Sequence, residues 1–235
     1  MGNGQQTKSR TPRLLAFYAS PVGRKVWTGI TGLALTIFVL VHMIGNLSYF
    51  AIDPDAYNLY SNFLLSLGPV LYLIEAVLLV FFVFHVTLGI GIWMRTRKAR
   101  KVNYERYATK GKPSLQGVSS RSMIITGIVL FVFVIVHLAS FKFGTYYETT
   151  IAGETVRDLR RLLEEKFVTP TYAFGYTAVM LLLALHLRHG FWSALQSIGA
   201  MKPRWTPVIY TLGTILGLLI AIGFLVLPLY IYFTA

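Results

Sequence analysis

The side chains most able to do chemistry in this 235-residue chain are its five histidines, all of which lie in long apolar stretches. Four of them lie 16 or 17 residues after a charged residue or a proline that opens the stretch. These pairs are Lys25 and His42, Pro69 and His85, Arg121 and His137, and Pro170 and His186. At 1.5 Å per helical residue, each of the four lies about 24 Å along its helix. Ligating side chains at such a depth in a membrane are costly and usually functional.

Successive spanning helices run in opposite directions, so the four histidines form two layers. His42 and His137 share one layer, and His85 and His186 share the other. Two imidazoles facing each other from different helices are suited to be the axial ligands of a non-covalent b-type haem, so two layers predict two stacked haem b groups. A zinc or copper site would need three or four ligands at one depth, whereas each layer has two histidines and no carboxylate.

The composition indicates a membrane protein. Mean hydropathy is +0.60, and only 13% of residues are charged, against about 25% in an average soluble domain. These values exclude a soluble enzyme and a disordered segment. The chain has no cysteine, so it can hold no disulfide, no cysteine-ligated iron–sulfur cluster and no covalently attached c-type haem.

The fold class expected is an all-α membrane protein with five transmembrane helices in a bundle around two haems. Five stretches have at most one charged residue and exceed the roughly 20 residues that a bilayer requires. The helices are expected near residues 25–50, 69–95, 121–143, 170–196 and 206–233. They form a transmembrane domain over residues 25–235, preceded by a basic segment over residues 1–24. Apolar residues at helical spacing also predict an amphipathic helix near 154–167, either on the outer membrane surface or as a solvated cap without chemistry.

The positive charge predicts the orientation. The net charge is +13, and most Lys and Arg residues lie in the N-terminal segment and in the 95–121 loop. The loop after the first helix has two aspartates and no base. By the positive-inside rule, the N-terminus is inside and the C-terminus outside, in the cell inner (plasma) membrane. His85 and His186 are then the inner pair, and His42 and His137 the outer pair. The basic face is expected to meet anionic lipid and soluble partner subunits, not nucleic acid.

Glycines accompany the paired histidines. Gly89 and Gly190 follow one helical turn after a histidine, and Gly45 follows three residues after another. A porphyrin lying against a helix needs such a gap, so these glycines are predicted to give the haems clearance; the alternative is close helix packing. His189 is turned about 60° from His186, so we expect His186 to be the ligand. His189 then bonds a haem propionate, lies near a quinone or makes a plain polar contact.

Four segments of the chain together resemble one family. They are SPVGRKVWTGITGLALTIFVLVHMIGNL, FHVTLGIGIW, VHLASFKFG and HLRHGFWSALQSIG. They resemble the five-helix di-haem cytochrome b subunit (b558 type) of succinate:menaquinone oxidoreductase and fumarate reductase, over about residues 15–233. The resemblance implies haem ligation by helices two and four on the inner side, and by helices one and three on the outer side. The fourth-helix pattern of that family is matched by His186, Gly190, Phe191 and Trp192.

What the family does is implied for this chain by the resemblance. The chain would be the membrane anchor and electron-transport subunit of succinate dehydrogenase, respiratory complex II of the tricarboxylic acid cycle. A flavoprotein and an iron–sulfur subunit would bind its inner face, and electrons would pass through the inner haem to the outer haem. The acceptor would be a quinone, with menaquinone expected. The chain would not oxidise succinate by itself, and a higher oligomer of the whole complex is a further expectation.

Two residues match a quinone pocket known from related complex II anchors, which have a Ser and an Arg four residues apart. Ser20 and Arg24 reproduce this spacing. Ser20 is equally suited to cap a helix that starts at Pro21, and Arg24 to pair with a haem propionate or a lipid phosphate.

The chain also departs from the family. Some relatives have a Glu two residues before the fourth-helix histidine, where this chain has Ala184, and Glu75 is the only carboxylate within a span. Proton return through glutamates is therefore not expected. Two other functions share these features: a di-haem anchor of a hydrogenase or formate dehydrogenase, and a haem-free transporter or sensor whose histidines move protons.

Overall fold

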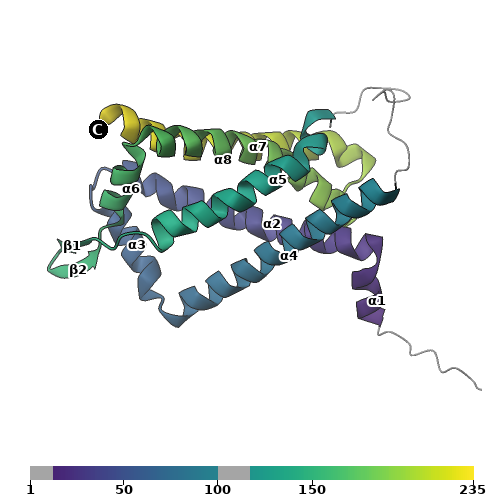
Figure 1. The fold of residues 1–235 in the computed structure, drawn as a ribbon, viewed down its shortest axis with the longest axis horizontal. Helices are drawn as coiled ribbons and strands as arrows, with labels where there is room; N and C mark the ends of the chain where they lie inside the picture. The colour runs from purple at the N-terminus through teal and green to yellow at the C-terminus, as the bar shows by residue number, and fades with distance from the viewer. Residues whose placement is uncertain (1–12, 100–116) are drawn as a thin grey trace, which may run out of the picture.

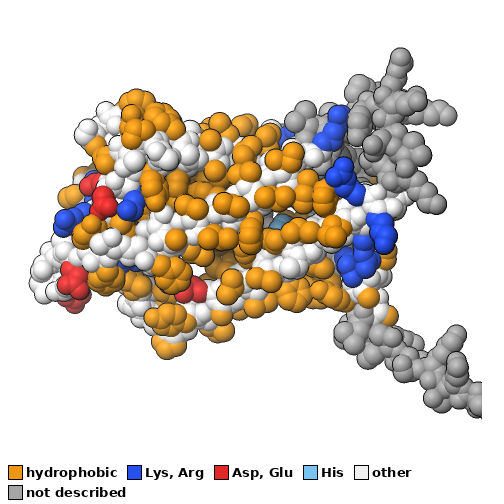
Figure 2. All heavy atoms as spheres, in the orientation of Figure 1, with side chains coloured by type: hydrophobic (Ala, Val, Ile, Leu, Met, Phe, Trp, Pro, Cys, Tyr) orange, Lys and Arg blue, Asp and Glu red, His pale blue; other side chains and the backbone are white. Residues whose placement is uncertain are grey.

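Five helices of the structure are long and apolar enough to cross a membrane, as the sequence predicts. The structure is a computed structural model that describes residues 13–99 and 117–235. Within that part of the chain, the spans are Pro21–Phe50, Pro69–Ala99, Ser119–Lys142, Pro170–Ser197 and Pro203–Thr234. They form one elongated bundle (Figure 1), and apolar side chains cover its middle (Figure 2). The chain is therefore a multi-pass helical membrane protein.

The elements follow in the order α1 to α8, with one hairpin before α6. The helices are α1 (Arg13–Ala19), α2 (Pro21–Asn46), α3 (Ala56–Ser66), α4 (Pro69–Ala99), α5 (Gly117–His137), α6 (Leu159–Phe167), α7 (Pro170–Ser197) and α8 (Thr206–Thr234). The strands are β1 (Glu148–Ile151) and β2 (Glu154–Arg157), and a π turn (Leu138–Lys142) extends α5. Short 3₁₀ turns (Leu47–Phe50 and Pro203–Trp205) follow α2 and precede α8.

The spanning helices start and stop at residues that favour those ends. The Ser20 Oγ accepts a hydrogen bond of 2.9 Å from the Gly23 N–H, and Pro21 follows as the first residue of α2. The interpretation of Ser20 as a helix cap is thus confirmed. At the other end of α7, Gly199 has a φ of +78°, the left-handed conformation that favours glycine and terminates a helix.

Small residues bring α2 and α8 close to α7. A Cβ added to Gly29 in α2 would lie 3.2 Å from the Ala194 Cα, and one added to Gly217 in α8 would lie 2.9 Å from the Ala184 carbonyl oxygen. Such close approach is how helices pack in a membrane, where burial of apolar surface offers little driving force. By contrast, α4 runs obliquely across α2 (Figure 1).

The two ends of the bundle differ in charge. We call the end where α2 begins the N-terminal end, and the end where α8 finishes the C-terminal end. In the view of Figure 2, Lys and Arg side chains gather at the N-terminal end, and Asp and Glu side chains lie toward the other. Exposed basic residues at the described helix ends there include Arg95, Arg97, Lys98, Lys202 and Arg204. This asymmetry matches the charge pattern from which the orientation was predicted.

The helix expected over residues 154–167 is shorter than predicted. Residues 154–157 form β2, which pairs antiparallel with β1. Ala152 and Gly153 have φ values of +51° and +85° and reverse the chain between the strands. The helix starts only at Leu159, where the Asp158 carboxylate accepts a 3.0 Å bond from the Arg161 N–H. Of the apolar residues at helical spacing, those from Leu159 onward belong to α6, whereas Val156 belongs to β2.

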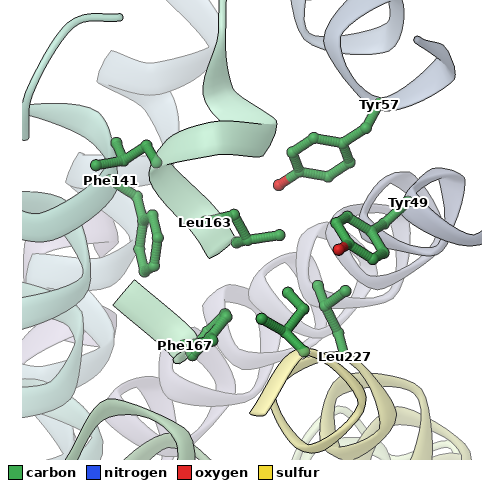
Figure 3. Packing of buried hydrophobic residues seen from close by; sticks show 8 residues of the cluster. Tyr49, Tyr57, Phe141, Leu163, Phe167 and Leu227 are labelled. Carbon is green, nitrogen blue, oxygen red and sulfur yellow. The ribbon is translucent and has the colours of Figure 1, made fainter. Parts of the chain in front are cut away.

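A compact cap closes the C-terminal end, built from α3, the hairpin and α6. Its apolar core joins these elements to the ends of the spans (Figure 3), and its buried members are Tyr49, Tyr57, Phe141, Leu162, Leu163, Phe167, Leu227 and Ile231. Hydrogen bonds reinforce it: the Asn58 amide donates to Asp158 at 2.9 Å, and the Tyr49 hydroxyl donates to Glu164 at 2.8 Å. Neither α1 nor α3 was expected from the sequence.

Candidate functional site

The structure places the four histidines in the two pairs expected from the sequence. The ring centroids of His42 and His137 lie 5.8 Å apart, with the rings inclined by 81°. The ring centroids of His85 and His186 lie 6.3 Å apart, with the rings inclined by 68°. The first pair joins α2 to α5 toward the C-terminal end, and the second joins α4 to α7 nearer the N-terminal end. We call them the C-terminal pair and the N-terminal pair.

The 6.3 Å separation of the N-terminal pair equals the distance expected for two imidazoles on either side of one metal, and the 5.8 Å separation of the C-terminal pair is shorter. Metal–imidazole bonds of about 2.0–2.1 Å, together with an imidazole radius of about 1.1 Å, put the two centroids about 6.3 Å apart. Within the described residues, no group of three or more histidine, aspartate or glutamate side chains could hold a metal ion. A group that brings most of its own ligands, as haem does, fits two histidines better than a bare metal ion does.

In the N-terminal pair, each histidine has a polar neighbour at its Nδ1. The His85 Nδ1 lies 3.2 Å from the Thr28 carbonyl oxygen, which can only accept, so this nitrogen is the donor. The His186 Nδ1 lies 3.1 Å from the Thr126 Oγ1, which also lies 3.1 Å from the Ser122 carbonyl oxygen. A ring that donates through Nδ1 keeps a lone pair on Nε2, which is the nitrogen that a neutral histidine then uses to bind a metal.

The C-terminal pair is held mainly by aromatic packing. Phe38 stacks on His42 with centroids 5.5 Å apart, and Phe133 stacks on His137 with centroids 5.7 Å apart. The Asn46 amide nitrogen donates to the His42 carbonyl oxygen at 2.8 Å and lies 3.5 Å from the His42 Nε2. The His137 Nδ1 is buried and has no hydrogen-bond partner among the described residues. The two pairs thus differ in their hydrogen bonding.

Two of the three predicted clearance glycines face open space. A Cβ added to Gly89 or Gly190 would meet no atom within 4 Å. Gly45 is different, because a Cβ there would lie 2.5 Å from Tyr60 ring atoms, so a tyrosine fills that space. Gly32 lies against the N-terminal pair: a Cβ there would be 3.0 Å from the His85 Cε1. Gly89 and Gly190 therefore face open space one helical turn after His85 and His186 in the chain.

Ser20 and Arg24 are in different situations. The Ser20 hydroxyl donates to the Phe17 carbonyl oxygen at 2.6 Å and accepts from Gly23, so it is occupied at the start of α2. The Arg24 Nε is buried without a hydrogen-bond partner in the described part of the chain. Its Nη1 lies 3.6 Å from where a Gly91 Cβ would be, so the guanidinium reaches α4. Arg24 is therefore the member of the two that is placed to bind an anion.

His189 and Glu75 belong to neither pair. The His189 ring packs on Trp192, with centroids 4.8 Å apart, and its Nδ1 is buried without a partner among the described residues. It is His186, and not His189, that faces His85. Glu75 forms an ion pair with Lys142 between α4 and the end of α5.

A lateral groove of about 490 Å³ runs between α5 and α7. Its lining is almost entirely apolar and includes Val132, Phe133, Gly175 and Tyr176. Phe133 and Tyr176 also contact the His137 ring, at centroid distances of 5.7 and 6.2 Å. The groove thus connects the membrane-facing side of the bundle with the wall of the C-terminal pair.

Sequence reasoning missed the residues that orient the rings. Thr28, Thr126 and Asn46 were not singled out, because a threonine or asparagine in a helix carries no signal of what it faces across the bundle. Asn46 could have been suspected, because it lies four residues after His42 and so on the same helix face.

Comparisons with protein-family models, curated proteins and solved structures find no match for this chain. The site defines it as a helical membrane protein with two histidine pairs at two levels of one bundle. Any assignment of function therefore depends on this geometry and on the sequence motifs.

Proposed function

We propose that the chain is a di-haem cytochrome b that anchors a succinate:quinone oxidoreductase or fumarate reductase in the membrane. The observation that carries the proposal is the pairing of four histidines across four helices, with centroid separations of 5.8 and 6.3 Å. The family resemblance of the four histidine motifs supports the same assignment. In this role the chain carries electrons between an iron–sulfur subunit and a membrane quinone, with menaquinone expected.

Each part of the site has a task in this proposal. His42 with His137, and His85 with His186, would each hold one haem b, which supplies a one-electron iron couple. The Thr28 carbonyl and the Thr126 hydroxyl would hold the Nδ1 atoms of the N-terminal pair, so that each Nε2 is left to bind the haem iron. Gly89 and Gly190 would leave room for that haem.

The charged end of the bundle would receive the soluble partners. In the proposed orientation the N-terminal end faces the cytoplasm of a cell whose plasma membrane holds the protein, so the N-terminal pair is the inner one. Basic helix ends there suit anionic headgroups and the flavoprotein and iron–sulfur subunits. Arg24 lies within the inner half of α2, and its guanidinium, whose Nε has no hydrogen-bond partner among the described residues, would stabilise a haem propionate. The lateral groove offers a quinone a route from lipid to the outer pair.

Purification of the complex in mild detergent tests the proposal. Two haem b per chain, a reduced-minus-oxidised b-type spectrum, and co-purifying flavin and iron–sulfur subunits that oxidise succinate are expected. A colourless chain would overturn the haem assignment and favour a transporter or sensor. A di-haem chain that co-purifies with a hydrogenase or a formate dehydrogenase would keep the haems and overturn the succinate assignment.

A further inference from the structure

Glu75 and Lys142 form an ion pair inside the membrane-spanning segments. The Lys142 Nζ donates to the Glu75 Oε1, and the two side chains are 35% and 37% exposed. Glu75 lies six residues into α4, about 9 Å along the helix from Pro69. A lysine at the end of a span can extend its ammonium to the interface, whereas a glutamate at this depth is too short to do so. Glu75 is therefore a charge that needs a partner, and Lys142 is that partner.

The backbone that carries Lys142 is continuous with His137. The π turn begins at the residue directly after His137, and its i to i+5 hydrogen bond runs from the Phe143 N–H to the Leu138 carbonyl at 2.9 Å. A π turn holds more residues than an α turn, so it rotates every later residue around the helix axis. Ser140 and Phe141 consequently face the packed interior, and Lys142 faces α4.

The ion pair joins α4 to the end of α5 at the C-terminal end of the bundle. In Figure 1, α4 crosses α2 obliquely, and the start of α4 lies apart from α2 at that end. His137 lies five residues before Lys142, and its buried Nδ1 has no hydrogen-bond partner among the described residues. In the N-terminal pair, by contrast, the Nδ1 of each ring has a hydrogen-bond partner.

We propose that Glu75 is a positioning residue for the C-terminal histidine pair: by holding Lys142 it fixes the π turn, and thereby the direction in which His137 faces His42. The predicted effect on haem binding rests on the proposed function. The Glu75–Lys142 ion pair, which we call the α4–α5 clasp, does not rest on it, because the ion pair forms with or without a bound haem.

The test compares Glu75→Gln and Lys142→Gln with a control in the same complex. Glu165→Gln removes the Glu165–Lys166 ion pair, whose Nζ–Oε1 distance is 3.1 Å and which lies on α6 outside the spans. We expect each of the first two variants to lose or spectrally alter the haem of the C-terminal pair, which is up to half of the total. The other haem and the control should match the parent protein. Unchanged haems in both variants, or equal damage to both haems, would overturn the positioning role.

A second experiment tests the clasp without haem. Because the chain has no cysteine, Glu75→Cys combined with Lys142→Cys gives the only thiol pair for a short bifunctional thiol reagent. Efficient intramolecular crosslinking in membranes is expected, and crosslinking should restore the C-terminal haem signal that the uncrosslinked double variant lacks. If the parent protein holds no haem, the proposed function fails, and the crosslink alone still decides whether the clasp exists. Absence of crosslinking would refute it.

Discussion

The rings of His85 and His186 face each other with centroids 6.3 Å apart, and each holds its Nδ1 against a different neighbouring helix. His85 is oriented by α2 through the Thr28 carbonyl, and His186 by α5 through Thr126. Four helices therefore converge on one pair of rings. The protein therefore orients both imidazoles through contacts with neighbouring helices.

If the chain binds two haems as proposed, the histidine pairing predicts which substitutions have the same effect. His85→Ala and His186→Ala should each remove the same haem, and His42→Ala and His137→Ala should each remove the other, so that every variant retains about one haem per chain. His189→Ala should retain two. Haem counting with redox difference spectra checks this. A variant of His42 that lost the same haem as a variant of His85 would show that the pairs are assigned wrongly.

The hydrogen bond to His186 predicts an effect of Thr126→Val, which keeps the shape of the side chain and removes the hydroxyl. Partners that orient a metal ligand are worth about 10–100-fold in affinity, so the variant should lose the haem of this pair more readily during dialysis. Thr87→Val is the matched control, because the Thr87 hydroxyl bonds only carbonyls of its own helix. Equal retention in both variants would argue against an orienting role.

The sequence alone could predict the five spans and the histidine pairs, because both follow from simple regularities. Spans follow from length and apolarity, and the pairs from equal depths in antiparallel helices. The cap could not be predicted in the same way. The strand at Glu154–Arg157 depends on pairing with Glu148–Ile151. Because the residues that follow have apolar side chains at helical spacing, the sequence predicted a helix over the strand as well.

The three clearance glycines show the same limit. Gly89, Gly190 and Gly45 have similar positions relative to a histidine, and only the first two face open space. Which space a missing side chain opens depends on the neighbouring helix, as with Tyr60 beside Gly45. The spacing of residues in the sequence predicts which face of a helix a residue lies on. It does not predict which side chain of a neighbouring helix packs against that face.

Two glycines predict opposite effects of adding one methyl group. Gly190→Ala should stabilise the haem-free protein by about 0.5–1 kcal/mol, because alanine favours the helix and the new Cβ meets no atom. Gly217→Ala should destabilise it by about 1–3 kcal/mol, because the new Cβ would lie 2.9 Å from the Ala184 backbone oxygen. Unfolding in detergent mixtures measures both. A stabilising Gly217→Ala would contradict the close approach of α7 and α8.

One hydrogen bond in the cap predicts a small dependence of the protein's stability on pH. The Tyr147 hydroxyl donates to the Glu165 Oε2 at 2.6 Å, and this bond, with Lys166 nearby, lowers the pKa of Glu165 below its ordinary value of 4.5. A carboxyl with a lowered pKa contributes stability above pH 4.5 and loses it as the pH falls through its value in the folded protein. Tyr147→Phe should therefore flatten the decrease in melting temperature below pH 4.5. Parallel curves for the two proteins would exclude this contribution.

Ser20 and Arg24 should separate into a structural and an electrostatic role. Ser20→Ala removes the cap of α2 and should cost about 0.5–2 kcal/mol of stability, whereas Ser20→Gly should cost only a few tenths. Neither should change the midpoint potential of the inner haem. Arg24→Gln should lower that potential by tens of millivolts, because loss of a nearby positive charge favours the oxidised form, and Arg24→Lys should restore part of it. Potentiometric titration with thermal unfolding measures both quantities. If Ser20→Ala shifted the potential as much as Arg24→Gln, the two residues would act together on one ligand, as in a shared quinone pocket.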